Sequence, residues 1–335
     1  LQLLVDKNII QVSEGKYRFL KDDEIDVAQL IKNTTINADD RLKYFYDDII
    51  DKIVKPKPDI NFFGNRNFKT AINIDDKEII RNGDFKIKFS VFDVSDMQQL
   101  AINSPANDLV IAIGEWFNTD NELKNRVLEY VRTQKFIANN SANATGTRVE
   151  TLNNFRNNNI ILLTEIKLRF EQKFMNTSII SNQQIITPDQ LNGANTASRL
   201  EDMIKKHLEE TFRKHTLSNA YASSNAELIT NAKSKQFKTN TELDPAEEEL
   251  VNKLNLMGEN PNVGDVVKTF EKVPYGWKDL ATLDMLLKIA QKGHKRFEWK
   301  NDSIDFVQYA DKALNSRERD SILILSQKAH SQEEI

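Results

Sequence analysis

Hydrophobic and polar positions at the start of the chain predict a small hairpin followed by two helices. Apolar residues at 1–5 have the spacing of a helix end, and the apolar positions within 9–20 flank a polar turn, which predicts two short strands. Acidic residues at 22–24 precede apolar positions at helical spacing, as is typical of a helix N-terminus. A second helix is predicted over 39–54 and ends before Pro56, where we expect a domain boundary.

The pattern changes from helical to alternating after residue 61. Over 85–91, apolar residues alternate with lysine and serine, which predicts a strand with one solvated face. The Asn82-Gly83 pair before it predicts a hairpin turn. Residues 109–113 are continuously apolar, as expected of a central strand, and helical spacing resumes over 123–131.

The middle of the chain predicts one long helix and several smaller elements. The spacing over 148–174 predicts a helix about 40 Å long, which is interpreted as a coiled-coil arm weakened by the three asparagines at 157–159. Residues 178–187 predict a strand or hairpin. Apolar residues at every fourth position over 200–212 predict an amphipathic helix, whereas 225–241 is polar and weakly patterned and is interpreted as a mobile connector.

The C-terminal pattern predicts a winged-helix domain. Helices are expected over 246–256, 263–270 and 280–290, and two short strands over 294–299 and 303–307 enclose a turn at Asn301-Asp302. Three helices followed by a hairpin in about 60 residues is the order of that fold. The hairpin near the N-terminus has the pattern of the end of a second such domain.

The expected fold class is therefore α+β, helix-rich and multidomain. Residues 1–58 are interpreted as a winged-helix tail with a helical linker, and 59–190 as an α+β domain that contains the long helix. Residues 191–241 are interpreted as an amphipathic helix with a connector, and 242–335 as the C-terminal winged-helix domain.

Composition narrows the chemistry. The chain has 335 residues and no cysteine, which excludes a disulfide scaffold, a thiolate metal site and a cysteine nucleophile. With 46 Lys and Arg against 50 Asp and Glu, no overall positive field exists to hold nucleic acid. No apolar run approaches the ~20 residues of a membrane helix, so a cytoplasmic protein without membrane partners is expected. Because residue 1 is leucine within an apolar helix end, the sequence is interpreted as a section of a larger protein.

The motif search predicts no catalytic, cofactor-binding or metal-binding residue. No phosphate-binding loop occurs, since Gly15-Lys16 lies in a hairpin turn without upstream glycines. The acids Asp93 and Glu115 at strand ends are interpreted as structural. On one helix, His207 and His215 would lie about 80° apart around the axis and would not converge on a metal, so solvated or capping roles are expected.

One basic and aromatic cluster offers a contact surface on the predicted wing and third helix. Its members on and around the wing are Lys292, His294, Lys295, Arg296, Phe297, Trp299 and Lys300, and Lys278 and Lys288 extend it along the helix. Such side chains can follow a phosphate backbone. Contact with another protein and a purely structural role, with Phe297 and Trp299 packed inward, remain alternatives.

The segment before the third helix resembles a known family. The stretch VPYGWKDLATLDMLLKIAQKGHKRF, with Pro274, Tyr275, Gly276 and Trp277, is similar to a segment of BrxC/PglY, the large P-loop ATPase of bacteriophage exclusion (BREX) systems. The order of parts along most of the chain agrees as well. Large prokaryotic ATPases of a related family carry similar modules. On physical grounds, Pro274 and Gly276 would set the turn and Trp277 would anchor it.

The resemblance implies a role in antiviral defence. It implies that ATP and Mg belong to a P-loop elsewhere in the parent protein, and that the partners are a DNA methyltransferase, an alkaline-phosphatase-like protein and DNA. This chain would then be a non-catalytic coupling section. The alternatives are a stand-alone winged-helix DNA-binding regulator and an assembly scaffold whose 148–174 helix docks a partner helix.

Overall fold

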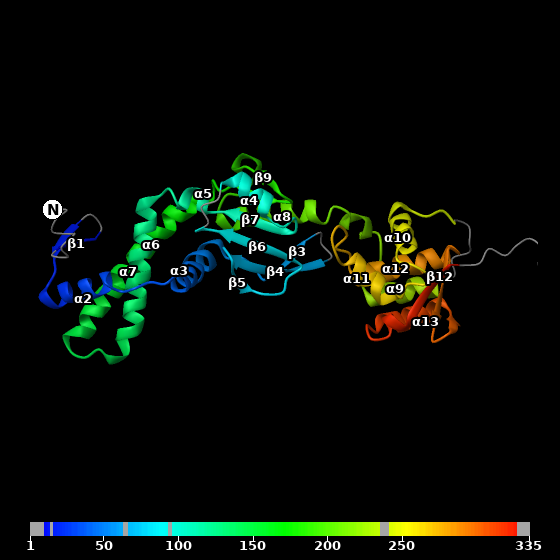
Figure 1. The fold of residues 1–335 in the computed structure, drawn as a ribbon. Coiled ribbons are helices and arrows are strands. Elements are labelled where there is room, and N and C mark those ends of the chain that lie inside the picture. The colour runs from blue at the N-terminus through cyan, green and yellow to red at the C-terminus, as the bar shows by residue number, and fades with distance from the viewer. Residues whose placement is uncertain (1–9, 14–15, 63–65, 93–95, 235–240, 327–335) are drawn as a thin grey trace, which may run out of the picture. The chain divides into compact units, whose positions relative to one another are not determined.

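The computed structural model describes residues 10–13, 16–62, 66–92, 96–234 and 241–326. The chain divides into two compact units. The first comprises residues 1–58 and 69–207, and the second comprises 59–68 and 208–335 (Figure 1). Helices and sheets occur in both units, and the predicted α+β, helix-rich class is confirmed.

The N-terminal elements follow the predicted order. Strands β1 (Ile10–Ser13) and β2 (Lys16–Phe19) form an antiparallel hairpin, and helix α2 (Asp22–Lys32) follows with three acids in its first turn. The second predicted helix is α3 (Ala38–Phe45), which continues as a π-helix, η1 (Tyr46–Val54). The predicted helix end at 1–5 lies outside the described residues.

A mixed sheet forms the centre of the first unit, although residues 59–68, with β3 and the start of β4, are counted with the second unit. Its strands are β3 (Asp59–Phe62), β4 (Arg66–Ile74), β5 (Lys77–Ile80), β6 (Phe85–Ser90), β7 (Asp108–Ala112), β8 (Ile179–Ser181) and β9 (Gln184–Ile186). The order is β3-β4-β6-β7-β8-β9, with β5 beside β4. Strands β4, β6 and β7 are parallel to one another, and every residue of β7 is buried, as predicted for a central strand.

The predicted hairpin at Asn82-Gly83 is wrong. Strand β5 folds back antiparallel on β4 through a turn at Asp75-Asp76, whereas β6 pairs with β4 in parallel. Residues 81–84 therefore carry the chain from β5 to β6 without pairing the two strands. Gly83 permits this path because a Cβ there would lie 2.2 Å from the backbone nitrogen of Ala71.

A helical hairpin extends from this sheet (Figure 1). After α4 (Met97–Asn103) and α5 (Gly114–Phe117), the long helices α6 (Asn121–Asn140) and α7 (Thr147–Phe174) pack against each other, and both contact α2. The predicted long helix is confirmed as a single unbroken helix of 28 residues. Instead of standing alone, it packs along α6, where Asn159 donates a hydrogen bond to the Tyr130 carbonyl (3.2 Å).

The interpretation of 225–241 as a connector is wrong for its first half. After α8 (Thr196–Thr211), residues Asn225–Lys233 form helix α9, whose Leu228 and Ala232 are buried in the core of the second unit. Two apolar positions were too few to reveal a helix face in the sequence. Residues 235–240 lie outside the described residues.

The C-terminal elements confirm the predicted three helices and hairpin and add two more. The predicted elements are α10 (Pro245–Leu256), α11 (Val263–Phe270), α12 (Asp279–Gln291), β10 (Lys295–Trp299) and β11 (Asp302–Ile304). Helix α13 (Phe306–Leu314) contains Val307, which was expected in a strand, and β12 (Ile322–Ser326) pairs with β10. The hairpin turn is at Lys300-Asn301, where both φ angles are positive, one residue before the predicted turn.

Short 3-10 turns complete the described elements. They are η2 (Ser141–Asn143), η3 (Pro188–Gln190), η4 (His215–Ser218) and η5 (Arg319–Ser321).

Candidate functional site

The turn that leads into α12 is built around Trp277. The Trp277 side chain is fully buried and stacks on Phe270, with ring centroids 4.6 Å apart. Its indole Nε1 donates to the Lys214 carbonyl (2.9 Å), and its backbone nitrogen donates to the Phe270 carbonyl (2.8 Å). The expectation that Trp277 anchors this turn agrees with these contacts.

Pro274 and Gly276 shape the same turn. The Val273–Pro274 peptide bond is cis, and Gly276 has a φ of 60°, a conformation that glycine adopts without the steric penalty of a side chain. A Cβ on Gly276 would lie 2.6 Å from the Phe212 ring. Glycine is thus required here both by the backbone conformation and by the packing.

Backbone groups of the turn bind the segment that follows α8. The Lys214 backbone nitrogen donates to the Pro274 carbonyl (3.0 Å), and His215 Nδ1 donates to the Gly276 carbonyl (2.9 Å). Tyr275 donates its hydroxyl proton to Glu249 (2.6 Å), and burial together with this carboxylate raises the pKa of Tyr275. Residues 274–277 therefore organise the core of the second unit.

Arg66 is a member of this arrangement that the sequence analysis missed. Its guanidinium donates to the carbonyls of Glu271 (3.1 Å) and Trp277 (3.2 Å). No local sequence signal connects Arg66 with a turn more than 200 residues later, because the contact depends entirely on the tertiary fold.

Two lysines of the proposed basic cluster are half-buried and pair with buried acids of the second unit. Lys288 lies 3.3 Å from the carboxylate of Asp284 and 4.3 Å from the centre of the Tyr221 ring. Lys292 forms an ion pair with Glu247. Both acids are fully buried, so the charges of these two half-buried lysines compensate internal carboxylates.

Asp284 is the centre of a buried polar network. It accepts hydrogen bonds from the Ala222 backbone nitrogen (3.0 Å) and from the Asn231 side chain (2.8 Å). Nearby, Tyr221 donates its hydroxyl proton to Asp244 (2.5 Å), and burial raises the pKa of Tyr221. The sequence analysis missed this network because Asp284 has the appearance of an ordinary polar residue on a helix.

The remaining cationic residues are spread over different elements. Lys278 is half-buried at the start of α12, and Lys295 donates to the Ser326 hydroxyl (3.1 Å), where burial lowers the pKa of Lys295. Arg296 lies 4.0 Å from the carboxylate of Glu298, and His294 donates to the Thr241 carbonyl (2.7 Å).

The aromatic residues of the hairpin differ in burial. Phe297 is buried and stacks on Tyr309, so it packs inward as the structural alternative expected. Trp299 is half-buried and lies beneath the ammonium groups of Lys300 (4.2 Å) and Lys312 (3.5 Å). Lys300, at the hairpin turn, is exposed.

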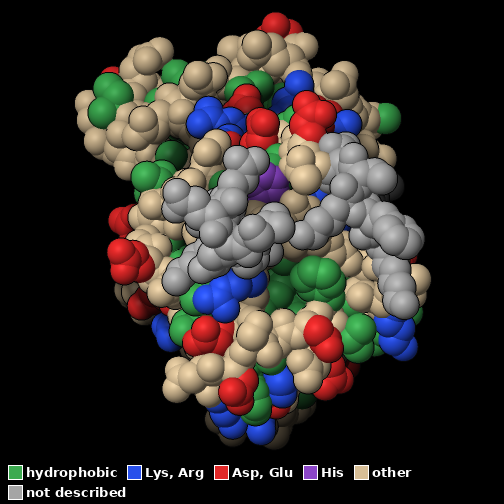
Figure 2. All heavy atoms as spheres, turned by 90° about the vertical axis from the view of Figure 1, so that its right-hand side faces the viewer, with side chains coloured by type: hydrophobic (Ala, Val, Ile, Leu, Met, Phe, Trp, Pro, Cys, Tyr) green, Lys and Arg blue, Asp and Glu red, His purple; other side chains and the backbone are tan. Residues whose placement is uncertain are grey.

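Charges of both signs are interspersed on the face shown in Figure 2. Lysine and arginine side chains lie beside aspartate and glutamate side chains, with apolar area between them. On the part of this face that is described, no continuous basic stripe is visible, so its electrostatic field is mixed.

The expected solvated or capping roles of the histidines are wrong for His207 and His215. Both are fully buried, and His215 lies in η4 beyond the end of α8. His207 Nε2 donates to the Asn107 carbonyl (3.2 Å), so Nδ1 accepts from the Ser181 hydroxyl (2.9 Å). Burial lowers the pKa of His207 to about 4, and it also lowers that of His215.

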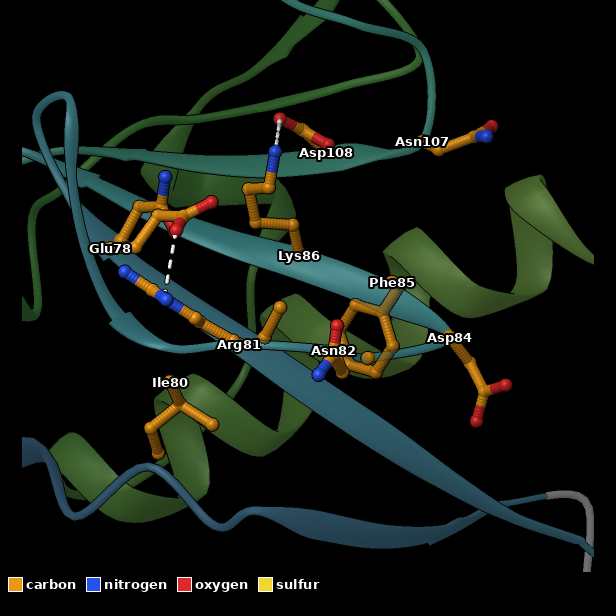
Figure 3. Close-up of a pocket in the computed structure, with 12 residues that line it drawn as sticks. Glu78, Ile80, Arg81, Asn82, Asp84, Phe85, Lys86, Asn107 and Asp108 are labelled. Atoms are coloured by element: carbon orange, nitrogen blue, oxygen red, sulfur yellow. Dashed lines mark hydrogen bonds and ion pairs between the residues drawn. The ribbon is translucent and has the colours of Figure 1, made fainter.

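A hollow of about 300 Å³ lies at the amino-terminal ends of β6 and β7 (Figure 3). Two ion pairs line it, Glu78 with Arg81 (3.1 Å) and Lys86 with Asp108 (3.4 Å). Ligands of open parallel sheets bind at the carboxyl ends of the strands, which is the opposite edge. A fifth charged residue, Asp84, also lines the hollow and accepts a hydrogen bond from the Lys69 backbone nitrogen (2.8 Å), so the lining carries one more acid than cations.

Neither a metal-binding cluster nor a membrane-spanning helix occurs in the described part of the chain. No three of its His, Asp and Glu residues are grouped so that they could hold a metal ion. Among the same residues, no helix is both long and apolar enough to cross a bilayer.

Comparisons with protein-family models, with curated proteins and with solved structures give no significant match.

Proposed function

We propose that this chain is a non-catalytic coupling and interaction section of a large BREX-type ATPase, and that its second unit contacts partner proteins in the cytoplasm. The support is the turn 274–277, which carries the resemblance and also organises the core of the second unit through Trp277 and Gly276. In this proposal, ATP and Mg are bound by another part of the parent protein. The suggested partners are the methyltransferase and the alkaline-phosphatase-like protein of the same system.

The observation that favours protein partners over DNA is the pairing of Lys288 with Asp284 and of Lys292 with Glu247. A helix that reads DNA needs cations free to approach phosphates and bases. Two of the three cations proposed on or beside α12 neutralise buried acids instead. The mixed charges in Figure 2 are compatible with a protein interface, where polar groups of both signs form the rim.

Binding to purified partners tests this proposal. The full chain is titrated with each suggested partner, and the variant Lys278→Glu/Arg296→Glu/Lys300→Glu is compared with the control Lys233→Glu/Lys272→Glu, which alters exposed lysines of other segments. We expect the wild type and the control to bind at least one partner and the triple variant to bind more weakly. Absence of binding to either partner would reject these partners, and ATP hydrolysis by the purified chain would reject a non-catalytic role.

DNA is the second candidate contact, and the exposed Lys300 beside Trp299 is the observation that favours it. Binding of a labelled duplex by this hairpin should weaken steeply as salt rises, and it should be lost in the triple variant. If the wild type shows no DNA binding at low salt, the DNA contact is rejected while the protein contact is unaffected.

A further inference from the structure

The hollow shown in Figure 3 lies on one face of the central sheet. Its lining includes side chains from four strands that occupy the same face by register, namely Asn73 of β4, Glu78 of β5, Lys86 of β6 and Asp108 of β7. Ala71 lies among them on this face, and its short side chain leaves the floor low. A space of about 300 Å³ is large enough for a small molecule.

The carboxylate of Asp108 is the feature that points to a ligand. Asp108 is only 8% exposed although it lines the hollow. Its Oδ2 atom lies 3.4 Å from Lys86 Nζ, whereas a charge-assisted hydrogen bond between such groups is usually about 2.7–2.9 Å long. Within the described part of the chain, its Oδ1 atom accepts no hydrogen bond, and this atom is not closed off from the surface. A largely buried carboxylate therefore has an oxygen available to a donor that enters the hollow.

Amide groups of the lining are available as well. Asn73, Asn82 and Asn107 line the hollow, and none of their side chains forms a hydrogen bond with another described residue. They come from β4, from the connection between β5 and β6, and from the position before β7. Each amide has a carbonyl oxygen that can accept a hydrogen bond, so the lining offers acceptors in addition to the carboxylate.

The charge of the lining favours a cation. Its charged residues are three acids and two cations, namely Glu78, Asp84, Asp108, Arg81 and Lys86. Helix α4 connects the parallel strands β6 and β7 and ends at Asn103, so its C-terminus, the negative end of the helix dipole, lies toward this edge of the sheet. Anions are favoured at the opposite edge, where the parallel strands end.

We propose that the hollow binds a small molecule through a primary ammonium group of that molecule. The three N–H donors of such a group match the Asp108 carboxylate and the amide oxygens of Asn73 and Asn82. Lys86 carries the same group and pairs with Asp108, so it competes with the ligand for this carboxylate. The binding is independent of the function proposed for the second unit, because all lining residues belong to the first unit.

An NMR titration of the full chain with n-butylammonium tests the proposed chemistry. The backbone amide signals of Asp108 and Gly83 should shift, with a dissociation constant of about 1–10 mM for a ligand of this size. Three matched probes should leave these signals in place at the same concentration and ionic strength: 1-butanol has no charge, tetramethylammonium has no N–H donor, and butyrate has the opposite charge. Equal shifts with all four probes, or no shift with n-butylammonium, would overturn the proposal.

Two variants with opposite expected effects locate the site. Asp108→Asn should weaken the binding of n-butylammonium at least about tenfold, because the charged acceptor is lost. The control Asp189→Asn, at an exposed acid of η3, should bind as the wild type does. Lys86→Gln should strengthen binding about threefold, because no internal ammonium then competes for Asp108. A gain of affinity cannot result from misfolding. Unchanged affinity in both Asp108→Asn and Lys86→Gln would show that the carboxylate does not bind the ligand.

Discussion

Trp277 stacks nearly parallel on Phe270, with an interplanar angle of 11°, while its indole nitrogen is bonded to the Lys214 carbonyl. One side chain thus connects three segments of the second unit: the turn before α12, the end of α11 and the segment after α8. Trp277 therefore belongs both to the segment that carries the sequence resemblance and to the centre of this core. We therefore expect the second unit to depend on this residue more than on the half-buried Trp299.

The first prediction concerns the contributions of the Trp277 ring and of its hydrogen bond. Trp277→Ala should lower the free energy of unfolding by about 3–5 kcal/mol, because a large cavity remains. Trp277→Phe keeps a ring against Phe270 but leaves the Lys214 carbonyl without its donor, at a cost of about 1–3 kcal/mol. Urea unfolding followed by circular dichroism measures both values. Equal losses for Trp277→Phe and the control Trp299→Phe would contradict the anchoring role.

The second prediction separates backbone conformation from packing at Gly276. Gly276→Ala should destabilise the second unit by about 2–4 kcal/mol, which combines the left-handed conformation with the clash against Phe212. Gly258 also has a positive φ, but a Cβ there would have no atom within 4 Å. Gly258→Ala should therefore cost only about 1–2 kcal/mol. If thermal unfolding shows the same loss for both variants, the Phe212 contact has no energetic role.

The third prediction assigns Lys288 a structural role. Lys288→Met should cost about 3–5 kcal/mol, because it leaves the fully buried Asp284 carboxylate without its cation. Asp284→Asn should also destabilise the unit, and the double variant should lose less than the sum of the two single losses. Lys300→Met, at an exposed position, should change stability by no more than about 0.5 kcal/mol.

Binding measurements complete the test of Lys288. If Lys288→Met unfolds normally but abolishes binding to DNA or to a partner protein, Lys288 belongs to the contact surface and its role is not structural. Unchanged binding by a less stable variant agrees with an internal ion pair.

Local patterns in the sequence were sufficient to predict the long elements. The helices over 148–174 and 200–212 and the three C-terminal helices are confirmed, because apolar residues recur at helical spacing in each of them. Helix α12 is in addition buried on nearly all sides. The π-helical stretch Tyr46–Val54 lay within a predicted helix and differs from it only in its hydrogen bonds.

Contacts between residues that lie far apart in the sequence could not be predicted. The Asn82-Gly83 turn could join two paired strands of a hairpin or connect two strands that do not pair with each other. Which of these occurs depends on the pairing of β6 with β4, which the local sequence does not reveal. The same limit applied to the cations of α12. In sequence, Lys288 is a polar residue of a helix, and only the fold brings it to Asp284 and Tyr221.

The last prediction follows from the buried His207 of the first unit. Burial lowers its pKa from 6.5 to about 4, so the folded protein keeps the ring neutral between these values while the unfolded chain binds a proton. The contribution of His207 to the free energy of unfolding is therefore fully present above pH 6.5 and is lost as the pH falls toward 4. The total change is about 3 kcal/mol, since each pKa unit corresponds to about 1.4 kcal/mol.

The variant His207→Gln tests this pH dependence because glutamine cannot take up the proton. Urea unfolding at pH 7.5 and pH 5.0 should show a smaller loss of stability on acidification for His207→Gln than for the wild type. The control His294→Gln removes one exposed histidine and should retain the wild-type loss. An NMR titration should find the His207 ring neutral at pH 5.5 in the folded protein. A ring already protonated at that pH would show that burial does not hold His207 in its neutral form, and that the predicted loss of stability on acidification has another source.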